Sequence, residues 1–155
     1  MTGFSRTPTV GDVMTSEPIV VRTDTPLAEA ARIMDERQVT GLPVVDAAGA
    51  VVGVISHTDM VRARALEYLW ANWHGLLVRH LMTSPAVTVH RSTPLTIAAL
   101  RMERRAIHRL VVVADDDERI PIGVVSTTDL VHLMADRPAV PKAAPPEPAA
   151  TRDPR

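Results

Sequence analysis

Two stretches of the sequence place hydroxyl side chains beside a carboxylate, directly after an apolar run. At the start of a helix, such hydroxyls can donate to a phosphate, and the partial positive charge of the helix end attracts the anion. The carboxylate only accepts hydrogen bonds, which suits the paired hydroxyls of a ribose. The alternative is that these residues only cap their helices, an interpretation with more weight for the first copy. The residues are Ser126, Thr128 and Asp129 in the second copy and Ser56, Thr58 and Asp59 in the first.

The second copy also carries a cationic pair that the first copy lacks. His108 and Arg109 precede its apolar strand, whereas Thr40 and Gly41 stand at the matching positions of the first copy. A guanidinium can hold phosphate through two parallel hydrogen bonds, and each charge-assisted bond contributes about 1.5–3 kcal/mol. We therefore predict that the second copy provides the better binding site.

No arrangement of side chains in the sequence suggests catalysis. The remaining histidines show no metal-binding spacing, and the motifs of nucleophilic serines and phosphate-loop lysines do not occur. Without cysteine, disulfides, thiolate metal sites and cysteine nucleophiles are excluded. The acidic run 115–118 lacks the spaced oxygens and the glycine of an EF-hand loop, so we expect a solvated hairpin tip. We expect neither a metal site nor an enzyme.

These stretches belong to a duplication that covers most of the chain. Residues 14–16 match residues 82–84 at a shift of 68, and residues 53–59 match residues 123–129 at a shift of 70. A two-residue insertion in a turn explains the change, because loops accept insertions at little cost. One copy of about 60 residues buries only a marginal core, so we expect the apolar sheet faces of the two copies to pack together.

Each copy predicts the element order β-α-β-β-α. Thr25 and Thr93 are expected at helix N-caps with the next proline as the first helical residue, and the helices should end near Arg37 and Arg105. Two apolar runs around a turn predict a hairpin, whose glycine lets another backbone or a ligand approach closely. The expected strands are 19–22, 42–46 and 51–56 in the first copy and 87–90, 110–114 and 120–126 in the second, with final helices starting near 58 and 128.

A segment from Arg62 to Leu81 joins the copies. Its large apolar residues are spaced for one face of a helix, and three interpretations are open. The helix could lie on the core of its own molecule, or it could form a homodimer contact through the two tryptophans of the chain. It could also lie on a membrane surface, but the few flanking arginines make this interpretation weaker. The apolar residues are Leu66, Leu69, Trp70, Trp73 and Leu77.

The overall charge of the chain does not favour binding to nucleic acid. The formal net charge is −1, and no run reaches the roughly 18 apolar residues of a membrane helix. The first 13 residues contain no apolar stretch that resembles a signal peptide, so we expect a cytoplasmic protein. The tail, which begins near Pro138 and is rich in proline and alanine, should be disordered.

The duplication, the element order and the ending Gly-x-x-Ser-x-Thr-Asp together resemble the CBS domain family, named after cystathionine β-synthase. The resemblance covers roughly residues 9–134. It implies an α/β (α+β) fold of tandem repeats, packed through their sheets with pseudo-twofold symmetry as a Bateman module, and clefts that hold AMP, ADP, ATP or S-adenosylmethionine. The expected boundaries are 8–66 for the first repeat, 67–77 for a helical linker, 78–136 for the second repeat and 137–155 for the tail.

The second repeat resembles those of the gamma subunits of AMP-activated protein kinase. By that resemblance Asp129 would bind the ribose hydroxyls, Ser126 and Thr128 would contact ribose or phosphate, and His108 and Arg109 would face phosphate. Adenine would lie in an apolar slot near Val87. The counterparts in the first copy are Ile19 for the adenine slot and Asp59, Thr58 and Ser56 for the helix start.

The leading hypothesis is a stand-alone regulatory module that senses an adenosine-containing nucleotide and passes the signal to an effector protein or to a homodimer interface. Asp129 is expected to matter more for binding than Asp59. The rival hypothesis is a scaffold whose clefts stay empty and whose function is dimerisation through Trp70 and Trp73. Nucleic-acid binding would require affinity that falls steeply with salt, and the charge argues against it.

Overall fold

The computed structural model describes residues 6–65, 71 and 75–135, and it contains the predicted order β-α-β-β-α in both copies. The first copy contains η1 (Val10–Asp12), β1 (Thr15–Ser16), β2 (Val21–Arg22), α1 (Leu27–Arg37), β3 (Gly41–Val45), β4 (Val51–Ser56) and α2 (His57–Ala65). The second copy contains α4 (Val78–Leu81), β5 (Thr88–Val89), α5 (Leu95–Arg105), β6 (Arg109–Val113), β7 (Pro121–Ser126) and α6 (Thr127–Ala135). The fold class is thus mixed α+β, as the sequence predicts.

The strands form two small sheets with β3 and β6 inside them. One sheet has the order β2-β3-β4 and the other has the order β1-β7-β6-β5. Along β3, Leu42 and Val44 belong to the core under α1, whereas Pro43 and Val45 are buried outside that core. Because successive side chains of a strand point to opposite faces, the second pair faces the other sheet. Burial on both faces explains why β3 and β6 are nearly unbroken apolar runs.

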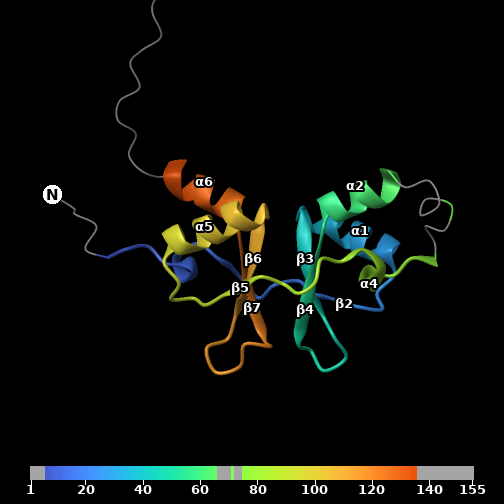
Figure 1. The fold of residues 1–155 in the computed structure, drawn as a ribbon, viewed down its shortest axis with the longest axis horizontal. Helices are drawn as coiled ribbons and strands as arrows, with labels where there is room; N and C mark the ends of the chain where they lie inside the picture. Colours follow the sequence, from blue (N-terminus) through green and yellow to red (C-terminus); the bar gives the residue numbers. More distant parts are fainter. Residues whose placement is uncertain (1–5, 66–70, 72–74, 136–155) are drawn as a thin grey trace, which may run out of the picture.

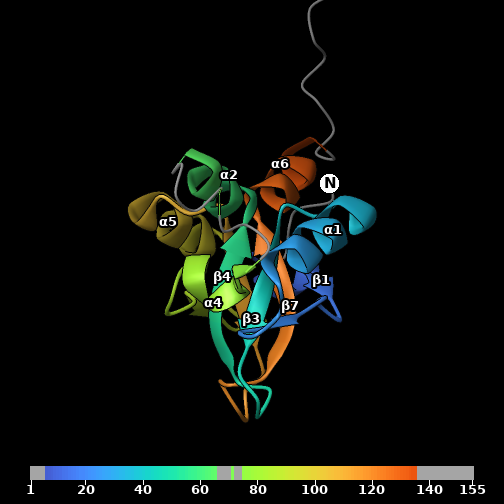
Figure 2. The same cartoon turned by 90° about the vertical axis from the view of Figure 1, so that its right-hand side faces the viewer.

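The two sheets pack against each other in the middle of the molecule, with helices on the outer sides (Figure 1). Helices α1, α2 and α4 lie beside the sheet of β3, and α5 and α6 lie beside the sheet of β6; the turned view in Figure 2 shows the strands of both sheets between these helices. The halves are related by a pseudo-twofold axis between the sheets. A backbone hydrogen bond of 2.8 Å from Val51 N–H to the Arg119 carbonyl also joins them.

The segment before each copy crosses to the opposite half of the molecule. Strand β1 pairs with β7 of the second copy, and Val10 is fully buried in the core of that copy. In the reverse direction, Val78 is buried in the first core and Thr83 bridges to Val54 of β4. The glycines of the hairpin strands permit this crossing, because a Cβ at Gly53 would lie 2.6 Å from the Thr83 carbonyl oxygen.

The predicted caps of the two long helices are wrong, although the predicted ends at Arg37 and Arg105 are correct. Helix α1 begins at Leu27 with Pro26 at its N-cap, and α5 begins one repeat later in the same way. The hydroxyl of Thr25 accepts a hydrogen bond from Arg22 N–H instead of capping α1. The first helical N–H, that of Leu27, donates to the Leu76 carbonyl, so the crossing segment satisfies the helix end.

The predicted linker helix lies largely outside the described residues, which leave out Leu66, Leu69, Trp70 and Trp73. At its far end, Leu77 has extended backbone and pairs with Pro26 before the short helix α4, so one helix does not run through to Leu81. The predicted tail also lies outside the described residues. Within the described part of the chain, no helix has both the length and the apolar character to cross a bilayer.

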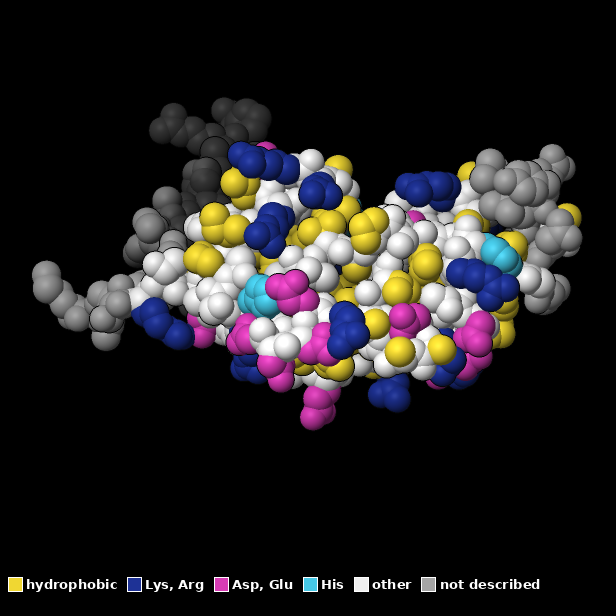
Figure 3. Space-filling model, turned by 60° about the horizontal axis from the view of Figure 1, so that its bottom comes forward, with side chains coloured by type: hydrophobic (Ala, Val, Ile, Leu, Met, Phe, Trp, Pro, Cys, Tyr) yellow, Lys and Arg dark blue, Asp and Glu magenta, His cyan; other side chains and the backbone are white. Residues whose placement is uncertain are grey.

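The acidic run 115–118 lies at an exposed hairpin tip between β6 and β7, as predicted. Asp117 accepts hydrogen bonds from the Arg119 side chain, and His90 contacts Glu118 at 3.0 Å. Figure 3 shows the face with the hairpin tips: acidic, basic and apolar side chains are interspersed on it. No group of His, Asp and Glu suited to a metal ion occurs among the described residues.

Candidate functional site

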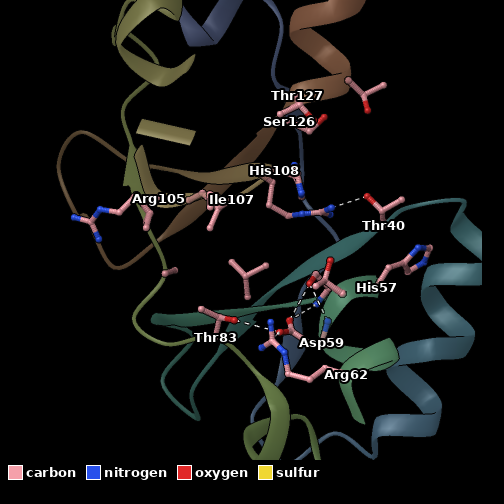
Figure 4. Close-up of a pocket in the computed structure, with 18 of the residues that line it drawn as sticks. Thr40, His57, Asp59, Arg62, Thr83, Arg105, Ile107, His108, Ser126 and Thr127 are labelled. Atoms are coloured by element: carbon pink, nitrogen blue, oxygen red, sulfur yellow. Dashed lines mark hydrogen bonds and ion pairs between the residues drawn. The ribbon is translucent and has the colours of Figure 1, made fainter. Parts of the chain in front are cut away.

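A cavity of about 570 Å³ lies between the two halves, where α2 and α6 begin (Figure 4). Its wall combines residues of both copies with the segment that leads into β5. The lining residues are Thr40, Val54, Ser56, His57, Thr58, Asp59, Arg62, Thr83, Pro85, Ala86, Val87, Arg105, Ala106, Ile107, His108, Arg109, Ser126, Thr127 and Thr128.

Asp59 is the carboxylate of this cavity, and its two oxygens have different surroundings. Oδ2 accepts hydrogen bonds from Ser56 N–H at 2.8 Å and Ser56 Oγ at 2.9 Å. Oδ1 accepts from Thr83 Oγ1 at 3.3 Å and lies 3.8 Å from the Arg62 guanidinium. The residue is only 4% exposed. One oxygen therefore fixes the carboxylate at the start of α2, and the other remains on the side of Thr83 and Arg62.

The same capping arrangement occurs in the second copy. Asp129 Oδ2 accepts from Ser126 N–H at 2.7 Å and from Ser126 Oγ at 3.1 Å. The capping role that the sequence left open is thus present in both copies. It uses one carboxylate oxygen in each case, so capping and ligand binding are compatible functions of these aspartates.

Arg109 brings a half-buried guanidinium to the cavity from β6. Its Nη2 donates to Thr40 Oγ1 at 2.6 Å, across the boundary between the copies (Figure 4). Burial lowers the pKa of Arg109 below its usual value, and the nearby charge of Asp59 partly opposes this shift. Since an arginine pKa starts far above neutrality, the group stays charged at pH 7.

The charges of the cavity favour an anionic ligand. Arg62, Arg105 and Arg109 line it, and Asp59 is the one carboxylate among the lining residues. The helices α2 and α6 both begin at the cavity, and their amino ends add partial positive charge. A phosphate would therefore find cationic side chains and hydroxyls at this wall.

An apolar wall lies beside the polar one. Val54, Val87 and Ile107 line it together with Pro85 and Ala86. Ligand sites are commonly apolar clefts of this size with a few convergent polar groups. A flat aromatic base fits such a wall, and a sugar and phosphate attached to the base would meet the polar groups.

The cavity gathers most of the predicted site residues but groups them differently. Eight of them line it: Ser56, Thr58, Asp59, Val87, His108, Arg109, Ser126 and Thr128. Ile19 packs against the first core, and Asp129 caps α6; neither lines this cavity. The carboxylate that shares the cavity with Arg109 is thus Asp59 of the other copy. A part for Asp129 and Ile19 in binding stays a prediction.

Thr40, Arg62 and Thr83 are polar lining residues that were not among the predicted site residues. Thr83 belongs to the repeated Met-Thr-Ser motif, so the duplication contained a signal for it. Arg62 follows Asp59 by three residues in a helix, which places both on one face. Thr40 had no signal, because its position was recognised only as one that lacks a histidine.

Comparisons with known proteins agree with this architecture. The family model described as "CBS domain" matches residues 10–66 and 78–136. A homoserine O-acetyltransferase of Methanococcoides burtonii is 34% identical over 125 residues, which are 81% of this chain and 24% of the relative. An L-aspartate semialdehyde sulfurtransferase of Methanocaldococcus jannaschii is 28% identical, over 83% of this chain and 23% of the relative. The chain spans about a quarter of the length of these curated relatives.

Solved structures give the same result for the fold. The CBS domain pair of protein MJ0100, solved with 5′-methylthioadenosine and S-adenosyl-L-methionine, has a TM-score of 0.74 at 28% identity, covering 84% of this chain and 98% of that one. CBSX2 in complex with AMP has a TM-score of 0.69 at 34% identity, covering 82% and 96%. CBSX2 from Arabidopsis thaliana has a TM-score of 0.70 at 33% identity, covering 86% and 100%. With two matched repeats, crossed segments and a cavity between them, this chain belongs to the CBS domain family.

Proposed function

We propose that this chain is a regulatory CBS pair that binds an adenosine-containing ligand of the AMP, ADP or ATP type in the cavity between its copies. One observation carries the proposal: a single cavity joins the buried carboxylate of Asp59 to the half-buried guanidinium of Arg109, and the two residues come from different copies. The ligands named for MJ0100 and CBSX2, which all contain adenosine, support it.

In this proposal each part of the ligand has a wall of matching chemistry. Adenine lies against Val87 and Ile107, and the ribose hydroxyls donate to Asp59 Oδ1. The phosphates lie toward Arg109 and His108. A carboxylate acceptor suits a diol, and a guanidinium suits phosphate oxygens. S-adenosylmethionine shares the adenosine part and is the second ligand class to test.

The ligand would act as a signal because it would contact both halves of the molecule at once. Coupling between such a ligand and a conformational or assembly equilibrium is typically about 1–3 kcal/mol. We propose a homodimer interface that includes Trp70 and Trp73, which lie outside the described residues, and an effector protein as the receiver of the signal. A regulatory function, a cytoplasmic location and the absence of catalysis are parts of the same proposal.

A second candidate function is an interaction scaffold without ligand. Exposed apolar side chains on the helices that border the cavity favour it: Val61 is 69% exposed on α2, and Val131 and Met134 are 60% and 72% exposed on α6. Exposed apolar groups often mark contacts with other proteins. A scaffold would bind no nucleotide, so ligand titration separates the two functions.

The proposal is tested by calorimetric titration of the chain with AMP, ADP, ATP and S-adenosylmethionine. We expect at least one of them to bind below millimolar concentration. Asp59→Asn should weaken binding roughly 10- to 100-fold, because it removes charge-assisted hydrogen bonds to the ribose. Asp129→Asn is the matched control, since it alters the same kind of helix cap outside this cavity.

Two results would contradict this account in different ways. If none of the four compounds binds the unmodified chain, the sensing function is wrong and the scaffold remains. If Asp129→Asn weakens binding more than Asp59→Asn does, the ribose lies at Asp129, as the sequence alone predicted.

A further inference from the structure

The guanidinium of Arg109 lies directly over the backbone of Gly41 in the other copy. A Cβ at Gly41 would collide with the Nη1, Cζ and Nε atoms of Arg109. Gly41 is buried at the start of β3, and its backbone carries no positive φ that would itself demand glycine. The missing side chain therefore makes room for the guanidinium.

Thr40 holds the same guanidinium by a directed hydrogen bond. Its Oγ1 accepts a hydrogen bond from Arg109 Nη2 at 2.6 Å. The other N–H groups of the guanidinium do not donate to this hydroxyl. Among the described residues, Arg109 forms no ion pair with a carboxylate. The guanidinium is half-buried, and the charge of Asp59 in the same cavity offsets its burial only in part. An anion in the cavity would therefore relieve the remaining cost.

The repeat explains why an arginine in one copy faces a glycine in the other. Gly41 and Arg109 are equivalent at the shift of 68, and each begins the first strand of its hairpin. Their partners across the hairpin, Ser56 and Ser126, are equivalent as well. Equivalent positions that contact each other lie at the pseudo-twofold axis. The contact between Gly41 and the guanidinium shows that the space there is filled by one arginine.

We propose that Thr40 and Gly41 form a seat for Arg109, and that this seat makes the cavity select phosphate-bearing adenosine ligands over uncharged and cationic ones. The proposal rests on the proposed function, because it specifies the ligand class of the same cavity. Thr40 and Gly41 are positioning residues: they act through Arg109. With the guanidinium held in the cavity, AMP gains a charge-assisted contact that adenosine lacks. S-adenosylmethionine is repelled because its sulfonium and ammonium outweigh its carboxylate and leave a net positive charge.

The test compares adenosine, AMP and S-adenosylmethionine by calorimetric titration of the unmodified chain and of Gly41→Ala. We expect the unmodified chain to bind AMP at least tenfold more tightly than the other two compounds. Gly41→Ala displaces the guanidinium and should lower the affinity for AMP by roughly tenfold, while the affinity for adenosine changes by less than about twofold. Gly75→Ala is the matched control, because a Cβ at Gly75 meets nothing within 4 Å; it should change neither affinity.

A second variant keeps the test decisive if Gly41→Ala does not fold. Thr40→Val removes the acceptor and preserves the shape of an exposed side chain, and it should lower AMP affinity several-fold with adenosine affinity unchanged. If adenosine and AMP bind the unmodified chain equally, or if the variants weaken both compounds equally, the seat is wrong and the adenosine site stands. If no compound binds the unmodified chain, the proposed function fails together with the seat.

Discussion

Asp59 and Asp129 occupy equivalent positions of the repeat, yet their neighbours differ. Each caps a helix through one oxygen, but only Asp59 has a second oxygen next to a threonine hydroxyl and an arginine. At the position of Arg62 the second copy has His132. Differences between the neighbouring residues of the two copies thus give the second carboxylate oxygens of the two aspartates different surroundings.

The carboxyl group of Asp12 makes the stability of the fold depend on pH. Its Oδ2 accepts from Thr9 N–H at 2.7 Å, and this bond, aided by Thr9 Oγ1 and Arg6, lowers the pKa of Asp12 below its ordinary value of 3.8. A carboxyl with a lowered pKa in the folded state contributes stability above its unfolded pKa and loses it as the pH falls through the folded pKa. We expect Asp12→Asn to lower the thermal midpoint near neutral pH and to make the midpoint less sensitive to pH below about 4. Differential scanning calorimetry across that range measures both, and an unchanged pH dependence would contradict the account.

At the scale of elements, the crossed segments decide how the copies hold each other. Strand β1 completes the sheet of the second copy, and the segment before β5 bridges to β4 of the first. The helix starts at Leu27 and Leu95 donate their first N–H groups to the crossing chain, at Leu76 and Pro8. Each copy therefore lacks part of its core and part of its hydrogen bonding without the other, so we expect the two to unfold together.

Val10 provides the test of this exchange. Its side chain is fully buried in the second core although it precedes the first copy in sequence, whereas Val20 is 39% exposed. Val10→Ala should lower the free energy of unfolding by about 1–3 kcal/mol, because it leaves a cavity in a packed core. Val20→Ala, the matched substitution at a partly exposed site, should change it by less than about 0.5 kcal/mol. Urea denaturation of both variants makes the comparison, and equal effects would mean that the crossing contributes little.

Across the whole molecule, the pseudo-twofold axis passes close to the contact between Gly41 and Arg109, which are equivalent positions of the repeat. Arg109 fills the space at Gly41, so one guanidinium occupies the place where these equivalent positions of the two copies meet. The duplicated fold is thus symmetric in its backbone and asymmetric in its charges. The buried carboxylate of Asp59 and the guanidinium of Arg109 line the same cavity, although they come from different copies.

This arrangement predicts one AMP bound per chain. Calorimetric titration should give a stoichiometry near one, and AMP at 100 times its dissociation constant should add about 2.7 kcal/mol to the free energy of unfolding. Native mass spectrometry provides an independent count of bound nucleotides. A stoichiometry of two equivalent sites would show that a second phosphate group needs no guanidinium from Arg109.

The duplication, the element order, the ends of the long helices and the hairpins could all be predicted from the amino-acid sequence. These features depend on local patterns: apolar periodicity, turn residues and residues repeated at a fixed shift. The crossing of the segments around Val10 and Val78, and the cavity that Asp59 shares with Arg109, could not be predicted in this way and are seen in the three-dimensional packing. The way in which the two sheets dock decides which copy contributes each group to the cavity. This packing joins residues that are far apart in the chain, and their local sequence patterns would be the same if the sheets docked differently.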